Sequence, residues 1–183
     1  SYTGENPFDW TSWIKGEDDD YGNNDSTYLK CINLFAESVA KLPIVTKVKT
    51  EKGDIDADKF YLYELLRLRP NTSMNAFECI KALIAMTKHH GSAGLYIDRI
   101  NGRVKGIYPV RINQFTVDNK GLIDSKKENK VLVDFTCGDV SGSCFEKDII
   151  ILRDNSMNGI DFIRTKTYIK DSIETNVKSQ RYQ

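Results

Sequence analysis

The 183-residue sequence has no excess of charge of either sign, and it has no long apolar run. Lys and Arg together number 26, as do Asp and Glu, so the chain lacks the overall basic charge that attracts nucleic acid or anionic lipid. Its longest apolar runs are a few residues, too short to span a bilayer, and no signal-peptide pattern is present. With 40% apolar and 28% charged residues, the composition is that of one globular domain with a buried core, and we expect no membrane partner.

The sequence also lacks the motifs that carry catalysis or nucleotide binding. Neither G-x-x-x-x-G-K-[ST] nor G-x-G-x-x-G occurs, and the segment 138–142 is not a G-x-S-x-G nucleophile elbow. Only two histidines, His89 and His90, are available as bases. Cys79 and His90 lie on one predicted helix but about 16 Å apart along its axis, far beyond contact. We therefore expect no enzyme activity, no catalytic residues and no cofactor.

The four cysteines do not form a dense disulfide framework, which favours a reduced, intracellular protein. Cys31 and Cys79 fall on the apolar faces of predicted helices and are expected in the core. Cys137 and Cys144 flank a Gly/Ser-rich loop, and a disulfide between them across a hairpin stays open as an alternative. A zinc site with the two histidines is not expected, because adjacent histidines on a helix point to different sides and no C-x-x-C knuckle exists.

The charges are unevenly distributed along the chain. Residues 1–25 contain seven acids and one base, whereas residues 164–183 contain five bases and two acids, so the two ends could attract one another within one chain or between copies. The first segment has no clear period but carries four large apolar residues: Phe8, Trp10, Trp13 and Ile14. We interpret residues 1–25 as a flexible acidic arm whose aromatic residues dock elsewhere, and its run Asp18–Asp20 as solvated charge rather than a metal site.

The first regular element is a helix over residues 26–41, because apolar side chains recur at helical spacing and Pro43 prevents the helix from continuing. Residues 44–50 then predict a strand, and residues 51–54 predict a turn. The apolar stripe of the helix consists of Tyr28, Ile32, Phe35 and Val39.

Two further helices are expected. One runs from residues 56–58 up to the Arg-Pro pair at 69–70, where proline disfavours a helical conformation for the preceding residue. The next, over residues 76–90, is apolar nearly all round, which indicates burial on several sides and makes it the expected centre of the fold. A capping-box-like start at residues 75–78 and a stop at Gly91 define its ends.

From residue 94 the hydrophobic period changes from that of a helix to that of strands. Residues 95–100 and 104–108, joined by Asn101-Gly102, predict a β-hairpin. Further strands are expected over residues 111–118, 130–136 and 148–153. A last helix is then predicted by a thin apolar stripe that consists of Phe162, Ile169, Ile173 and Val177. The fold class is α+β: N-terminal helices packed on a mainly antiparallel sheet, followed by the start of a stem-like helix.

The hairpin interleaves basic residues with Tyr96 and Tyr108, which together could neutralise a phosphate backbone and stack on bases. Alternating basic residues are also the usual way to protect a sheet edge. A nucleic-acid-binding α+β module is therefore an alternative function, and an enzyme domain centred on Cys79 with a separate partner domain is a third. The candidate nucleic-acid contacts are Arg99, Arg103, Lys105 and Arg111.

A series of short motifs occurs in a fixed order along the chain. These are a helix ending in Leu42-Pro43, the pair Leu65-Leu66 followed by Arg69-Pro70-Asn71, the segments Met74–Phe77 and Gly91–Arg99, the triplets Gly102-Arg103-Val104 and Tyr108-Pro109-Val110, and the strand Asp148–Arg153. In order and spacing the series resembles phage portal proteins of the long-tailed double-stranded DNA phages, although Ser92 and Gly94 stand where that family usually has Asn and Tyr. The positions that carry the structural motifs are Leu42, Pro43, Arg69, Pro70, Asn71, Gly91, Arg99, Gly102 and Pro109.

The resemblance implies a structural subunit of a portal ring, usually of twelve subunits, at one capsid vertex. Double-stranded DNA would pass non-specifically through its channel, terminase would dock during packaging, and capsid and head–tail connector proteins would be further partners. The implied location is the virion, and the host cytoplasm during assembly. Residues 26–160 would form the wing or core domain and residues 161–183 the truncated start of the stem helix, so we expect a fragment of a longer protein. Near-neutral charge suits such a conduit, because phosphate-binding residues would slow the DNA.

Overall fold

The computed structural model describes residues 26–118, 130–138 and 140–156, together with three single helical residues, Lys170, Thr175 and Lys178. The expected acidic arm therefore lies outside the described residues, as do the four apolar residues of the expected last helix. The three single residues are helical within the segment for which a stem-like helix was predicted. The domain limits at residues 25 and 160 stay predictions.

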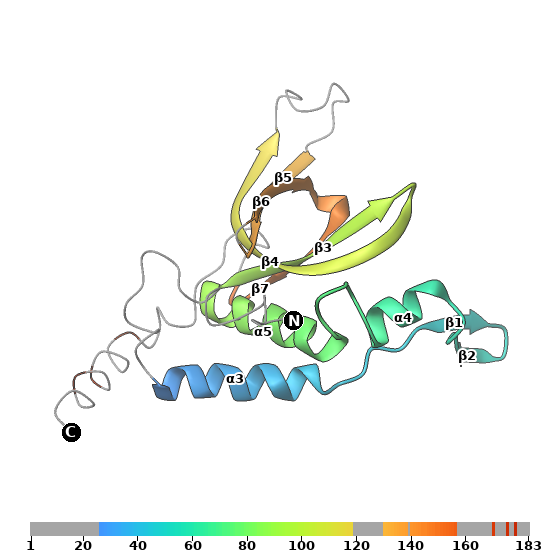
Figure 1. Ribbon diagram of the computed structural model, residues 1–183, viewed down its shortest axis with the longest axis horizontal. Helices are drawn as coiled ribbons and strands as arrows, with labels where there is room; N and C mark the ends of the chain where they lie inside the picture. Colours follow the sequence, from blue (N-terminus) through green and yellow to red (C-terminus); the bar gives the residue numbers. More distant parts are fainter. Residues whose placement is uncertain are drawn as a thin grey trace, which may run out of the picture.

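Two helices and a sheet form three layers (Figure 1). Helix α3 (Ser26–Ala40) packs on helix α5 (Ala76–His90), and α5 packs in turn on a five-stranded antiparallel sheet. A third, short helix, α4 (Tyr61–Arg67), lies near the start of α5. The predicted α+β class with helices against an antiparallel sheet is confirmed.

Helix α5 is the centre of the core, as its all-round apolar sequence predicts. Asn75 and Glu78 form the complete capping box at its start: each side chain accepts a hydrogen bond from the other residue's backbone N–H at 2.9 Å. Gly91 ends the helix with a left-handed φ of 83°.

Toward the sheet, α5 contributes Cys79, Ala82, Leu83 and Met86 to one core cluster. Toward α3, it contributes Ala85 and Ile84 to another, with Tyr28, Ile32 and Ala36.

The sheet has the strand order β6-β5-β4-β3-β7. Its strands are β3 (Ser92–Ile100), β4 (Arg103–Asp118), β5 (Lys130–Cys137), β6 (Val140–Phe145) and β7 (Ile149–Arg153). Asn101 and Gly102 both have positive φ, 52° and 79°, as the two central residues of a type I′ hairpin turn require. The predicted hairpin is thereby confirmed.

The sheet is strongly curled because its two edge strands are consecutive in the chain. Only the 3-10 turn Glu146–Asp148 joins β6 to β7. In a flat sheet the two edges would be about 19 Å apart, since strands are spaced by about 4.8 Å. The four residue steps from Phe145 to Ile149 span at most about 14 Å. The sheet therefore closes toward a barrel (Figure 1), and Cys144 of β6 and Ile149 of β7 share one core cluster inside it.

Several local predictions were wrong. The segment 53–56 was expected to be a turn followed by a helix start, but Gly53–Asp56 is strand β2, which pairs with β1 (Lys47–Thr50) in a separate two-stranded sheet. The loop expected between Cys137 and Cys144 is instead a tight hairpin into β6. Cys31 is exposed and not in the core.

The predicted apolar stripe of α3 also includes a residue that is exposed in the structure. Among the described elements, the main contact of this helix is with α5, so the face that it buries there is narrow. Phe35, which was placed on that stripe, is 48% exposed, and the Lys88 ammonium lies 5.2 Å from its ring centroid.

Candidate interaction sites

The Pro-Asn break between α4 and α5 is attached directly to strand β4. The Ile107 N–H donates to the Pro70 carbonyl at 2.8 Å, and the Asn71 side-chain amide donates to the Ile107 carbonyl at 2.9 Å. The Asn71 side-chain oxygen accepts from the backbone N–H groups of Ser73 and Met74, both at 2.9 Å. Pro70 and Asn71 are buried. The break therefore extends the hydrogen-bond ladder of β4 on the side away from β3.

The same edge explains how Pro109 fits inside a strand. The sequence separates strands at residues 104–108 and 111–118, but β4 runs through both without a break. Ile107 directs its N–H away from β3, and Pro109, two residues later, presents its nitrogen to the same side. Strand β5 pairs with β4 only from Arg111 onward, so the missing N–H of Pro109 interrupts no ladder.

Three of the four candidate nucleic-acid contacts lie at the turn end of the β3–β4 hairpin, and the fourth, Arg111, lies at its other end. Arg99 pairs with Asp148, with 3.1 Å between its Nε and the carboxylate oxygen. Arg103 places its guanidinium 5.2 Å from the ring centroid of Tyr61. Lys105 is exposed at the irregularity of the β3–β4 register, and Arg111 is half-buried between its partners on β3 and β5.

The two tyrosines of the hairpin are not arranged for base stacking. Tyr96 stacks on Phe135 with 5.0 Å between ring centroids, and both Tyr96 and Tyr108 pack against the core cluster inside the curled sheet. Burial, followed by the nearby Asp98 carboxylate, raises the pKa of both tyrosines. The hairpin thus separates its basic groups from its aromatic rings, contrary to what the nucleic-acid alternative requires.

The cysteines and histidines show no catalytic arrangement within the described part of the chain. All four cysteines are free, so Cys137 and Cys144 do not pair. Burial raises the pKa of the Cys79 thiol to about 12, which leaves almost no thiolate at neutral pH. His89 and His90 lie in the last turn of α5, as predicted, and both are buried there. Among the described residues, no group of three or more His, Cys, Asp or Glu side chains could hold a metal ion.

Two ion pairs tie α5 to its neighbours. Lys81 of α5 contacts Glu37 of α3 at 2.8 Å, and the hydrogen bond from that ammonium lowers the pKa of the Glu37 carboxyl. Lys88 contacts Asp154, just after β7, at 2.8 Å. The Tyr28 hydroxyl and His89 Nδ1 are 3.2 Å apart, which adds a polar contact between α3 and α5.

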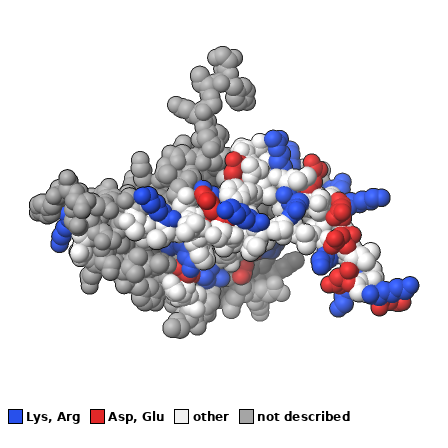
Figure 2. Space-filling model, turned by 90° about the horizontal axis from the view of Figure 1, so that it is seen from below, with Lys and Arg blue, Asp and Glu red and all other residues white. Residues whose placement is uncertain are grey.

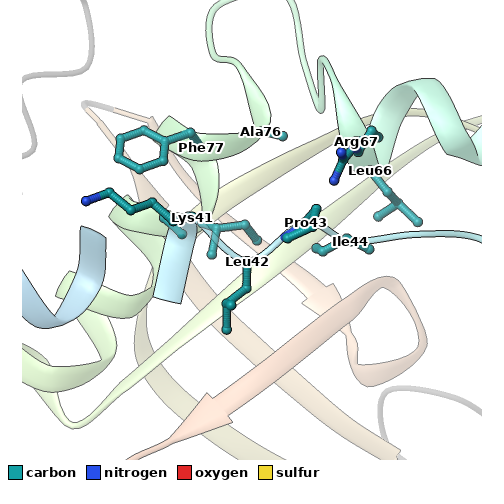
Figure 3. A pocket seen from close by; sticks show the side chains of 10 residues that line it. Lys41, Leu42, Pro43, Ile44, Leu66, Arg67, Ala76 and Phe77 are labelled. Atoms are coloured by element: carbon teal, nitrogen blue, oxygen red, sulfur yellow. The ribbon is translucent and has the colours of Figure 1, made fainter. Parts of the chain in front are cut away.

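An open groove lies where the segment after α3 passes α4 and the start of α5. It has a volume of about 300 Å³, and the motif residues Leu42 and Pro43 line it together with Leu66, Phe77 and Ile80. Figure 3 shows Lys41 beside Phe77 on one side of the groove and Arg67 beside Leu66 on the other. Leu42 is 69% exposed, and Ile44 and Phe77 are each 38% exposed.

The sequence predicts the residues of this groove as part of the core or as helix-terminating residues, and it does not predict the groove itself. Phe77 belongs to the helix predicted over residues 76–90, whose nearly all-round apolar sequence indicates burial, and Leu42 is predicted as part of the Leu-Pro motif that ends the preceding helix. The signal in the sequence is the run Leu42–Val45, in which three of four residues are aliphatic although Pro43 disfavours both a helix and a central strand. The structure shows that all four residues are exposed.

Elsewhere the surface is mixed in charge. Seen from below, basic and acidic groups are interspersed, and both signs gather at the end where the β1–β2 hairpin projects (Figure 2). Within the described ranges, no helix is both long enough and apolar enough to cross a membrane.

Comparisons with known proteins add two findings. A family model described as "Phage portal protein" matches residues 26–183. One solved chain, in a structure titled "Neck of empty GTA particle computed with C6 symmetry", has a similar fold, with a TM-score of 0.62 and 12% sequence identity over 100% of this chain. The present chain covers 46% of that solved chain, which is less than half its length. The search of curated proteins found no match.

Proposed function

This chain belongs to the phage portal protein family, and we propose that it is the wing part of a subunit in a ring-shaped portal. The family is structural, and the observation that carries the proposal is the family match over residues 26–183. The fold shared with a chain from a particle neck, a symmetric assembly, supports a place in the virion. Because this chain spans less than half of that neck chain, the ring and its partners belong to the proposal.

The proposed ring contains twelve copies, a number compatible with the sixfold symmetry of the similar neck, because a twelvefold ring also has sixfold symmetry. In this role the ring passes double-stranded DNA without gripping it. The described surface suits that task because basic and acidic groups are interspersed on the face shown in Figure 2, and two basic groups of the hairpin, Arg99 and Arg103, already contact Asp148 and Tyr61. Terminase, capsid and head–tail connector proteins are the proposed partners, and assembly takes place in the host cytoplasm.

Native mass spectrometry and electron microscopy of the full-length protein test the ring. We expect closed rings with a central channel. A protein that stays monomeric across the accessible concentrations and forms no rings in micrographs would overturn the proposal. The isolated residues 1–183 are not a substitute, because they cover only 46% of the similar neck chain.

DNA binding separates the ring from the nucleic-acid-binding alternative. We expect weak binding to single- and double-stranded DNA, and we expect it to be unchanged by Arg103→Glu. Tight binding with a steep salt dependence that Arg103→Glu abolishes would instead establish the hairpin as a nucleic-acid site.

A further inference from the structure

The groove beside Leu42 is open and is lined mainly by apolar residues, with a substantial share of polar surface, and the portal role does not account for it. Leu42 and Ile44 follow a helix end, and Phe77 begins α5, so their side chains are held by elements whose positions the core fixes. An exposed apolar surface of this kind usually marks a contact site. The described residues that line the groove carry only two charges, Lys41 and Arg67, and both are basic. The matching occupant is an apolar segment with acidic residues beside it.

One segment of this chain has that composition. Residues 1–25 contain seven acids and one base, and their large apolar residues fall close together at Phe8, Trp10, Trp13 and Ile14. An acidic run, residues 17–20, follows immediately. A segment that fills an apolar groove with Trp and Phe while its carboxylates face Lys41 and Arg67 satisfies both features of the site.

The segment is long enough to reach the groove of its own chain. It enters the described structure at Ser26, the first residue of α3, whereas the groove lies at the other end of that helix. Fifteen helical residues cover about 22 Å. The eleven residues 15–25 between the apolar group and α3 span up to about 38 Å when extended. The apolar group can therefore return along α3 to the groove. The acidic run is closer to α3: Glu17 lies nine residue steps before Ser26, about 31 Å when extended, whereas Asp20 lies six steps before it, about 21 Å. The beginning of the run can therefore reach the groove, and its end cannot.

A second exposed apolar site, on the β1–β2 hairpin, fits this segment less well. On the β1–β2 hairpin, Val48 and Ile55 are cross-strand partners and both are exposed. Their neighbours in the register are two Lys–Asp pairs, Lys47 with Asp56 and Lys49 with Asp54. That surface carries as much negative as positive charge, so it offers no electrostatic preference for an acidic segment.

We propose that the apolar residues of segment 1–25 pack into the groove of the same chain, with the first acids of the run, Glu17 and Asp18, beside Lys41 and Arg67. Such packing would cover Leu42, Ile44 and Phe77 and would fix the entry to α3. The proposal goes beyond the portal role and does not depend on it, because the contact is made within one chain.

Tryptophan fluorescence tests the contact directly, because Trp10 and Trp13 are the two tryptophans of the chain. In residues 1–183 we expect emission shifted to shorter wavelength, and weaker quenching by acrylamide, than in the same chain unfolded in urea. Leu42→Asp should move both readings toward the unfolded values while the far-ultraviolet circular dichroism stays unchanged. Lys41→Glu combined with Arg67→Glu should act in the same direction, and added salt should weaken the wild-type contact.

Leu34→Asp is the matched control. Leu34 is on α3 outside the groove and is 68% exposed, against 69% for Leu42, so both variants add one acid at an equally exposed leucine. Tryptophans as accessible in the folded wild type as in urea would overturn the proposal, and so would equal shifts for both leucine variants. A signal that depends on protein concentration would overturn the assignment to the same chain. None of these results bears on whether the full-length protein forms rings.

Discussion

Replacing Asn71 with alanine should destabilise the domain far more than its size suggests. Its side chain makes three hydrogen bonds: one donated to the Ile107 carbonyl and two accepted from the N–H groups of Ser73 and Met74. The residue is buried, so water does not replace the lost partners. With a net value near 1 kcal/mol for each bond, Asn71→Ala should cost about 3 kcal/mol.

The same substitution four residues later is the internal control. Asn75 is an exposed helix cap, and Asn75→Ala removes one capping box. Loss of a cap costs about 1 kcal/mol. In a protein of this size 1 kcal/mol lowers Tm by about 2–4 °C, so we expect decreases of roughly 6–12 °C for Asn71→Ala and 2–4 °C for Asn75→Ala.

Thermal and urea unfolding followed by circular dichroism measure both variants. Amide exchange adds a local probe, because the Ile107 N–H donates to Pro70 and should exchange faster once the turn at Asn71 loosens. If Asn71→Ala costs no more than Asn75→Ala, the side chain does not hold the turn to β4, and the reasoning is wrong.

Two further predictions concern the core. Gly94→Ala would place a Cβ atom 2.6 Å from Ile149 Cδ1, so we expect a loss of about 1–3 kcal/mol in unfolding free energy. In a double-mutant cycle with Ile149→Ala, the double variant should lose less unfolding free energy than the sum of the two single variants. Additive losses would contradict the steric explanation. Burial raises the pKa of the Cys79 thiol from 9.0 to about 12, so its contribution to stability is complete below pH 9 and is lost as the pH rises toward 12. Cys79→Ala should therefore flatten the decline of the urea midpoint over that range, and an unchanged slope would mean that the buried thiol does not contribute.

The predictions that held were those with a complete local signal. Helix α5 has its capping box at Asn75, its left-handed stop at Gly91 and apolar residues all round, and each signal acts within a few residues of the chain. The Asn101-Gly102 turn likewise determines its hairpin through two backbone conformations. Where local chemistry specifies an element without help from distant residues, the sequence is sufficient.

The predictions that failed depended on what lies opposite an element. Strand β2 has no apolar alternation, and it becomes a strand because the backbone of β1 pairs with it. Cys31 is apolar and on a helix, but within the described part of the chain α3 packs mainly on α5, so Cys31, which lies off that face, is exposed. The curl of the sheet follows from the short 3-10 turn Glu146–Asp148, of which only Asp148 was predicted, as the first residue of a strand.

Two motifs that are far apart in the sequence form one junction in the fold. The Pro70 carbonyl and the Asn71 amide both bind Ile107, and Pro109 lies two residues further along the same edge of β4. An ordinary residue at 109 would present an N–H on that edge, where β5 has not yet begun to pair. Proline removes that donor, while Pro70 and Asn71 satisfy the donor and acceptor of Ile107. Among the described residues, this part of β4 therefore offers no free N–H from Ile107 to Pro109 with which another strand could pair, and a sheet edge without free donors is protected against edge-to-edge association.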